Sequence, residues 1–238
     1  MIRLVVFDLA GTLVEDHGEV LVSVTSALER QGIQVPTDEI REWRGASKRD
    51  VIRHFIERHT DTGAAGATGD RVDRTYADFR RLLAEQYATH GITPIAGAAR
   101  TLDWLGDRGI RIAATTGFDR DVADLILARA GWQQPLANLV CGSDVPLGRP
   151  APYMIFRAME AARVTNVREV AVVGDTPLDL QAESNAGVKT IVGVLTGAHG
   201  EARLRREPHT HILSGVGALP DLIARELERT APGPEVAP

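Results

Sequence analysis

The stretch Phe7-Asp8-Leu9-Ala10-Gly11-Thr12 is the clearest indication of the fold. It overlaps the run Ile2–Phe7, which is apolar apart from Arg3 and is typical of a strand buried on both faces of a parallel sheet. A carboxylate therefore stands directly after a buried strand, with a glycine and a hydroxyl side chain close behind it. Ligands of open parallel sheets bind outside the carboxyl ends of the strands. Asp8 is thus the first candidate site residue.

The rest of the chain repeats this alternation of buried strand and helix. Similar apolar runs lie at Ile110–Thr115, Asn138–Gly142, Val170–Gly174, Thr190–Val194 and, more weakly, Thr210–Leu213. Segments with helical character lie between the later runs at Arg120–Ala130, Pro152–Ala162 and Leu178–Ala186. Strands that alternate with helices predict an α/β fold with a parallel sheet and right-handed crossovers.

The interval between the first two predicted strands is too long for one crossover. Helical periodicity is present at Val20–Gln31, Lys48–His59 and Asp70–His90, and Asp61–Gly69 is typical of a loop. We predict a core domain at residues 1–15 and 93–230, with an all-helical cap domain inserted at 16–92. Paired hinges are expected at 16–18 and 91–97, and 231–238 is predicted to be a disordered tail.

The composition of the chain argues against several classes of function. The 238 residues include 44% hydrophobic and 25% charged residues, as in a soluble globular protein, and the net charge is −5. Without a basic stripe, a nucleic-acid partner is not expected. No apolar run is long enough to span a membrane, and the N-terminus has no secretory signal. Cys141 is the only cysteine, so the chain cannot form an internal disulfide and a cytoplasmic location is expected.

Hydroxyl and carboxylate side chains follow the later runs as well. Thr115 and Thr116 stand at the end of the second run, before Gly117, and Asp175 follows the fourth run, with Asp179 four residues later. One Asp after a strand often only caps the next helix. Several such residues, each at the carboxyl end of a parallel strand, indicate one shared site.

The order of these residues resembles the four motifs of the haloacid dehalogenase superfamily, over nearly the whole chain. The matching stretches are Asp8-Leu9-Ala10-Gly11-Thr12, Thr115-Thr116, Gly148-Arg149-Pro150 and Gly174-Asp175-Thr176-Pro177-Leu178-Asp179. The resemblance implies a Rossmann-like core with a helical cap of the C1 type. It also implies that Asp8 is a covalent nucleophile toward phosphorus, and that water then hydrolyses the acyl phosphate.

The same resemblance implies a Mg²⁺ cofactor, a hard cation that neutralises phosphoryl oxygens and takes oxygen ligands. The implied ligands are the carboxylates of Asp8 and Asp175, the main-chain carbonyl of Ala10 and, through water, Asp179. Asp179 could instead orient Arg149. Thr115 and Arg149 are expected to bind the phosphoryl group and supply positive charge. Residues expected to contact the substrate are Ala10, Gly11, Thr12, Gly45, Thr116 and Gly117.

Ala10 stands where most phosphomonoesterases of the superfamily have a second Asp that protonates the leaving group. An alanine methyl cannot transfer a proton, so ester hydrolysis would lose a factor of about 10²–10⁴ unless another group substitutes. The chain resembles phosphonoacetaldehyde hydrolase (phosphonatase) in three features: alanine at this position, the stretch Thr115-Thr116-Gly117 and the arginine of motif three. In that family a cap lysine forms an imine that accepts electrons when the carbon–phosphorus bond breaks.

Lys48 aligns with that lysine, in Arg44-Gly45-Ala46-Ser47-Lys48-Arg49-Asp50. Only Lys48 and Lys189 are lysines among the 27 basic residues, and arginine cannot supply a neutral amine. Neighbouring cations such as Arg44 and Arg49 favour the neutral form of a lysine. The alternative is that Lys48 is only a cation that contacts substrate, and these two interpretations have equal weight.

Three positions depart from phosphonatase. Arg44 replaces a methionine, Val51 a histidine that helps move protons, and Phe118 a tyrosine. The phosphonatase-like hydrolases match better. Their signature stretches are present as Thr116-Gly117-Phe118-Asp119-Arg120, Gly148-Arg149-Pro150-Ala151-Pro152 and Leu195-Thr196-Gly197-Ala198-His199.

The expected function is therefore a Mg²⁺-dependent hydrolase that cleaves the carbon–phosphorus bond of a small phosphonate aldehyde, phosphonoacetaldehyde or an analogue. One alternative is a phosphomonoesterase acting on a small phosphorylated metabolite. Another is a non-catalytic phosphoryl-binding module. The expected partner is this small molecule. The chain is also a candidate for a homodimer, since related proteins often pair through the cap.

Overall fold

The computed structural model describes residues 1–59, 65–136 and 138–230. Its parallel sheet has the order β3-β2-β1-β4-β5-β6, which confirms the predicted α/β class. The strands are β1 (Leu4–Asp8), β2 (Arg111–Thr116), β3 (Leu139–Cys141), β4 (Val170–Gly174), β5 (Thr190–Val194) and β6 (His211–Leu213). The strand order reverses beside β1, and this is where ligands of doubly wound sheets bind.

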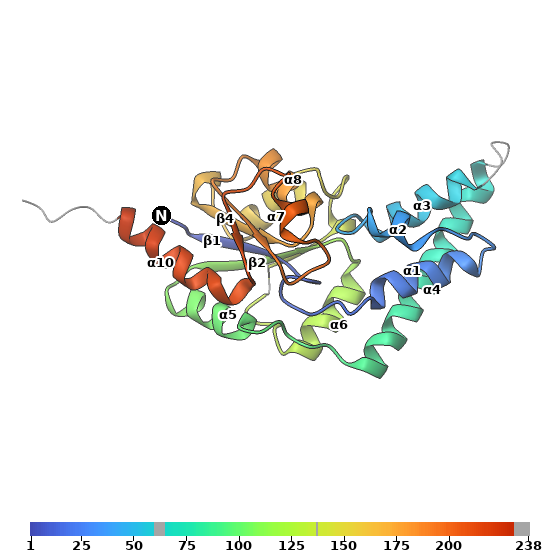
Figure 1. Cartoon of the computed structure of the whole chain (residues 1–238), viewed down its shortest axis with the longest axis horizontal. Coiled ribbons are helices and arrows are strands. Elements are labelled where there is room, and N and C mark those ends of the chain that lie inside the picture. Colours follow the sequence, from blue (N-terminus) through green and yellow to red (C-terminus); the bar gives the residue numbers. More distant parts are fainter. Residues whose placement is uncertain (60–64, 137, 231–238) are drawn as a thin grey trace, which may run out of the picture.

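Both faces of the sheet are covered, which explains why its strands are continuously apolar. In β1, Val5 and Phe7 belong to one apolar cluster, while Leu4 and Val6 belong to the other. The first cluster includes α5 (Ala98–Asp107), α6 (Arg120–Ala130) and α10 (Leu219–Thr230), and the second includes α7 (Tyr153–Ala161) and α8 (Pro177–Ala186). Figure 1 shows these two helical layers on opposite sides of the strands.

Four helices follow β1 and lie beyond one end of the sheet (Figure 1). They are α1 (Glu19–Glu29), α2 (Thr37–Arg41), α3 (Lys48–Arg58) and α4 (Ala65–His90). Helix α4 packs against both α1 and α3. The described residues between 16 and 92 form helices and turns without a strand. The division into a core and a cap stays a prediction that this arrangement supports.

The two chain segments that join these helices to the sheet lie side by side. The Glu15 N–H donates to the Thr93 carbonyl at 2.9 Å, and the Ile95 N–H donates to the Leu13 carbonyl at 2.8 Å. Val14 also forms a bridge with Pro94. Such pairing is what two hinges of one inserted domain require.

Part of the predicted loop at Asp61–Gly69 is wrong. Helix α4 begins at Ala65, so residues 65–69 are helical, and residues 60–64 lie outside the described residues. Glycine and threonine made this segment resemble a loop, but the alanines among them are strong helix formers. The predicted tail at 231–238 also lies outside the described residues.

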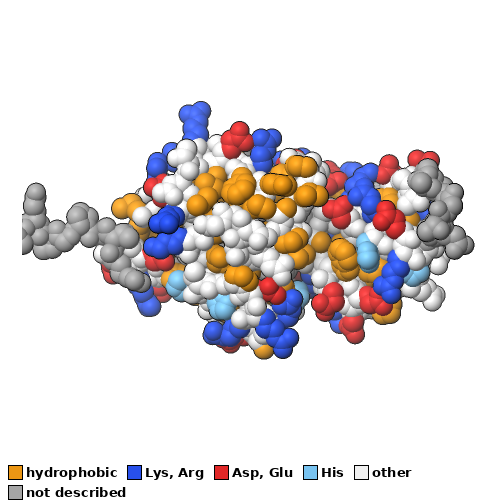
Figure 2. All heavy atoms as spheres, turned by 90° about the horizontal axis from the view of Figure 1, so that it is seen from above, with side chains coloured by type: hydrophobic (Ala, Val, Ile, Leu, Met, Phe, Trp, Pro, Cys, Tyr) orange, Lys and Arg blue, Asp and Glu red, His pale blue; other side chains and the backbone are white. Residues whose placement is uncertain are grey.

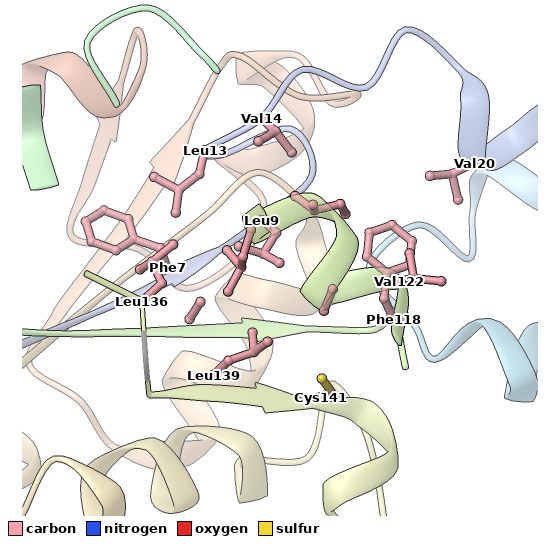
Figure 3. Packing of buried hydrophobic residues seen from close by; sticks show 14 of the residues in the cluster. Phe7, Leu9, Leu13, Val14, Val20, Phe118, Val122, Leu136, Leu139 and Cys141 are labelled. Carbon is pink, nitrogen blue, oxygen red and sulfur yellow. The ribbon is translucent and has the colours of Figure 1, made fainter. Parts of the chain in front are cut away.

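The surface has no dominant sign of charge on the face shown in Figure 2, where acidic and basic side chains alternate. Among the described residues, no helix combines the length and apolar character that crossing a bilayer requires. The apolar interior reaches from Phe7 in β1 and Leu9 directly after it to Phe118 before α6 and Val122 within α6 (Figure 3).

Candidate active site

Strands β1, β2 and β4 bring the predicted residues to one edge of the sheet. Asp8 ends β1 and pairs in register with Thr115 of β2, and Asp175 directly follows β4. These strand ends border a cleft with an empty volume of about 420 Å³, which suits a small ligand. Eight predicted residues line it, namely Asp8, Ala10, Gly45, Lys48, Thr116, Gly117, Arg149 and Asp175.

The other four predicted residues lie just outside this lining. Gly11 and Thr12 form a tight turn behind Asp175. Gly11 has a φ of 94°, which favours glycine, and a Cβ there would collide with the Asp175 carboxylate. The Thr12 hydroxyl donates to Asp175 Oδ1 at 3.1 Å. These two residues therefore position Asp175.

Arg149 is the centre of the polar network under the cleft. Its Nη1 lies 2.9 Å from Asp8 Oδ1, and its Nε lies 2.8 Å from Asp179 Oδ1. Its Nη2 donates to the Thr115 hydroxyl at 2.8 Å and to the Thr115 carbonyl at 3.1 Å. All three nitrogens are engaged, and the side chain is only 4% exposed. Arg149 thus holds Asp8 in place by a charge-assisted hydrogen bond.

Asp179 is buried and turned toward Arg149. Its Oδ2 accepts from the Thr176 N–H at 3.0 Å and from the Thr176 hydroxyl at 2.5 Å, closing a capping box at the start of α8. Because Oδ1 pairs with Arg149, both oxygens have protein partners. This geometry supports the orienting role for Asp179 over the role of a metal ligand.

Two of the carboxylates that line the cleft, those of Asp8 and Asp175, are disfavoured in their charged form. Burial raises the pKa of Asp8 to about 7 against the opposing effect of Arg149, and nearby Asp179 adds to the rise. Burial and the charge of Asp8 also raise the pKa of Asp175. A bound cation would relieve both effects.

This donor set fits a hard divalent cation. The carboxylates of Asp8 and Asp175 and the main chain at Ala10 all border the cleft. Among the described residues, no three Asp, Glu, His or Cys side chains form a metal-binding group. A metal held here would therefore need main-chain, water or substrate oxygens as further ligands, as Mg²⁺ commonly does.

Lys48 begins α3, and its amine is buried in the cleft. The Nζ donates to the Ala46 carbonyl at 2.8 Å and lies 5.7 Å from the centre of the Phe118 ring. Burial lowers the pKa of Lys48 from 10.5 to about 8, Asp8 opposes this shift, and Arg149 adds to it. A substantial fraction of the amine is therefore neutral near pH 8.

Close backbone contacts seat the loop before α3 on the core. The Lys48 N–H lies 3.4 Å from the Gly117 carbonyl, and a Cβ on Gly117 would come within 2.6 Å of the Ala46 carbonyl oxygen. Gly45 has a φ of 87° and faces the Thr176 side chain. Glycine at 45 and 117 is thus required by contact between the two parts of the fold.

Five further residues that the sequence did not assign to the site line the same cleft, namely Asp16, Val20, Arg44, Phe118 and Thr176. The sequence signal at Asp16 was a carboxylate in a predicted hinge. Thr176 carried the signal of a capping box, Thr-x-x-Asp, which indicates a helix start rather than a site. Phe118 was visible only as a departure from the phosphonatase pattern, and Arg44 as such a departure and as a cation near Lys48 in the sequence.

Glu183 is a second buried acid that sequence patterns missed. It is 1% exposed and borders a small pocket between α7, α8 and β4, beside Arg149 and Asp179. Neither carboxylate oxygen has a hydrogen-bond partner in normal geometry among the described residues. Burial and the charge of Asp179 raise the pKa of Glu183 well above its usual 4.5.

Replacing Glu183 by methionine is expected to stabilise the protein by about 1–3 kcal/mol, because it removes an unpaired buried carboxyl at similar side-chain volume. The folded chain keeps this proton at pH values where the unfolded chain has lost it, so Glu183 lowers stability as pH rises above 4.5. The advantage of Glu183→Met should therefore increase with pH. Thermal unfolding from pH 5 to 8 measures it, with the exposed Glu160→Met as control. Lower stability than wild type at pH 8 would contradict this account.

A family model for haloacid dehalogenase-like hydrolases matches residues 2–187. The chain belongs to this family. Curated relatives agree with the assignment. The haloacid dehalogenase-like chain is 32% identical over 209 residues to phosphonoacetaldehyde hydrolase of Bacillus cereus, covering 83% of the chain and 77% of the relative. It is 33% identical to a bifunctional phosphonoacetaldehyde hydrolase/aminoethylphosphonate transaminase of Clostridioides difficile, where the match covers 83% of the chain but 32% of that longer protein.

Solved structures of other proteins share the fold. A hydrolase from Pseudomonas syringae superposes with a TM-score of 0.80 at 21% identity, covering 97% of this chain and all of the other. A phosphonoacetaldehyde hydrolase-like protein from Oleispira antarctica gives 0.79 at 21% identity, covering 96% and 95%. The chain is thus a hydrolase whose relatives include phosphonoacetaldehyde hydrolases.

Proposed function

We propose that this hydrolase cleaves the carbon–phosphorus bond of a small carbonyl phosphonate, using Asp8 as nucleophile and Lys48 as imine former. The observation that carries the proposal is the buried Lys48 amine, which shares one cleft with Asp8 and has a pKa lowered to about 8. Ala10 in the same cleft offers no proton to an ester leaving group. The likeness to phosphonoacetaldehyde hydrolases supports the same chemistry.

The first step is condensation of the neutral Lys48 amine with the substrate carbonyl, which takes up one proton, releases water and leaves an iminium ion, and the proton returns to solvent when the imine is hydrolysed. The Asp8 carboxylate then attacks phosphorus. The electron pair of the breaking carbon–phosphorus bond moves into the iminium, which becomes an enamine, and an acyl phosphate forms on Asp8. Arg149 holds the attacking carboxylate through its 2.9 Å ion pair.

Two hydrolyses complete the cycle. One water releases phosphate from Asp8, while protonation of the enamine carbon and attack of a second water on the imine release the carbonyl product and restore Lys48. Mg²⁺, when bound at Asp8, Asp175 and the main chain at Ala10, supplies positive charge for the phosphoryl oxygens. Gly45 and Gly117 allow the closed loop contact that excludes bulk water.

A phosphomonoesterase is the second candidate, and Asp16 favours it. This carboxylate lines the cleft in addition to Asp8 and Asp175, so it offers an acid–base group that Ala10 lacks. Asp16 pairs with Arg44, however, at 3.2 Å. A leaving group would therefore have to compete with Arg44 for this carboxylate.

A substrate panel distinguishes these reactions. We expect phosphate release from phosphonoacetaldehyde in the presence of Mg²⁺, and a loss of at least about 10²-fold when EDTA removes the metal. Release from phosphate monoesters but not from the phosphonate would replace the first proposal by the second. Release from neither compound class, with saturable phosphate binding, would indicate a binding module.

A further inference from the structure

The side of the cleft formed by residues before α3 carries an ion pair that the proposed steps do not use. Arg44 and Asp16 both line the cleft, with Arg44 Nη2 lying 3.2 Å from Asp16 Oδ2. Their side chains are 20% and 11% exposed, so the pair is half-buried and still open to a ligand. Asp16 is held from the other side, since its Oδ1 accepts from the Gly18 N–H at 3.0 Å.

Arg44 has donors left for a ligand. A guanidinium carries five N–H donors, and the side chain of Arg44 forms no hydrogen bond or ion pair other than the one with Asp16 in the part of the chain that the structure describes. Arg149, the other arginine of the cleft, differs because protein groups engage all three of its nitrogens. Arg44 is therefore the arginine of this cleft with capacity for an anion.

Arg44 shares the cleft with both groups that the proposed steps use. Asp8 comes from the end of a strand, whereas Arg44 precedes the loop that carries Lys48, and all three residues line the cleft. Arg44 is near enough to Lys48 to contribute to the lowered pKa of the amine. A ligand with its phosphoryl group at Asp8 and its carbonyl carbon at Lys48 would thus share its cleft with the free donors of Arg44.

We propose that the substrate carries a carboxylate on the carbonyl carbon, and that Arg44 binds this carboxylate. The substrate class is then a 3-phosphono-2-oxo acid, in which a carboxylate replaces the hydrogen of an aldehyde. This inference rests on the proposed function and keeps its reaction steps unchanged. Imine formation at Lys48 and attack by Asp8 release phosphate and a 2-oxo acid, with the net uptake of one water.

The chemistry of the pair fits this role. The planar fork of arginine matches a carboxylate through two parallel hydrogen bonds, and partial burial strengthens them. Asp16 holds the fork in place before the substrate arrives, which limits the entropy lost on binding. An aldehyde hydrogen, by contrast, would leave the free donors of Arg44 without an acceptor.

The test compares 3-phosphonopyruvate with phosphonoacetaldehyde, which differ at this substituent, in the full-length protein with Mg²⁺. We expect a higher kcat/KM for 3-phosphonopyruvate. Arg44→Met should lower that kcat/KM by about 10- to 100-fold more than it lowers the value for the aldehyde, mainly through KM, because the aldehyde loses only the effect of Arg44 on the Lys48 amine. Arg44→Lys should restore part of the loss. Arg41→Met is the matched control, since Arg41 is 57% exposed and pairs with Asp38 on α2.

Each other result has a distinct meaning. Equal loss on both phosphonates in Arg44→Met would assign Arg44 to hinge structure and overturn the inference. A wild-type preference for the aldehyde would also overturn it, while leaving the proposed function intact. If neither phosphonate releases phosphate, the proposed function fails first. Phosphoglycolate and ethyl phosphate then repeat the comparison for monoesters, and a preference for phosphoglycolate that is independent of Arg44 would overturn carboxylate binding.

Discussion

Asp8→Asn is expected to reduce phosphate release by about 10⁴- to 10⁶-fold, the scale on which loss of a nucleophile abolishes covalent catalysis. An asparagine amide keeps the size of the side chain but cannot form the acyl phosphate. Arg149 keeps Asp179 as a charged partner at 2.8 Å, so the polar network under the cleft should survive the change. Steady-state phosphate release on the best substrate of the panel measures the effect.

Stability separates this loss from misfolding. Burial raises the pKa of Asp8 from 3.8 to about 7, so the folded chain holds a proton that the unfolded chain loses as pH rises above 3.8. This contribution makes the wild type less stable at pH 8, and the neutral asparagine removes it. Asp8→Asn should therefore unfold at the same or a higher temperature without metal. Asp38→Asn, at an 89% exposed position, should change neither activity nor stability. Retention of a tenth of the wild-type rate in Asp8→Asn would refute the nucleophile assignment.

The core of the fold could be predicted because a strand that is buried on both faces of a sheet is a continuous apolar run in the sequence. Residues Val170–Gly174 and Thr190–Val194 have the predicted bounds, and so does the helix Arg120–Ala130. At the first strand the prediction began two residues early. Pairing starts at Leu4, opposite Arg111 and Val170, although Ile2 is equally apolar and buried. The apolar character of a segment indicates that it is buried. Where a strand begins and ends depends on the strands that it pairs with, and the local sequence does not show these.

The residues of the candidate site could likewise be predicted from the sequence only in part. Asp8, Thr116 and Asp175 could be placed because each ends or directly follows a parallel strand, and that topology brings strand ends together. Asp16 and Arg44 could not, because the helices must first fold against the sheet before either residue meets the cleft. Glu183 was equally hidden. Its position on α8 has no local signal for a buried acid whose oxygens make no hydrogen bond of normal geometry to the described residues.

Lys48→Arg is the second decisive change, and it should reduce carbon–phosphorus cleavage by about 10³-fold or more, as expected when a covalent step is lost. Arginine preserves the positive charge and much of the length of the side chain, but it is never a neutral amine in a protein. Substrate binding through charge should therefore persist while imine formation is lost. The expected signature is a large decrease in kcat with a smaller change in KM.

The pH profile supplies an independent measure of the same group. The nucleophilic form of Lys48 is the neutral amine, and burial lowers its pKa to about 8. For wild type, kcat/KM on the phosphonate should therefore rise with pH and level off above about 8. The residual activity of Lys48→Arg should lack this rise.

Trapping then assigns the covalent step to one residue. Borohydride should reduce the imine in the presence of substrate, inactivate the enzyme and leave the added mass on the peptide that contains Lys48. The chain contains only one other lysine, the exposed Lys189, so Lys189→Arg is a matched control that should retain both activity and trapping. Undiminished turnover in Lys48→Arg, without a trapped adduct in wild type, would exclude imine chemistry. Since a carbanion would then have no electron sink in the cleft, carbon–phosphorus cleavage would lose its mechanism and the phosphomonoesterase would become the better account.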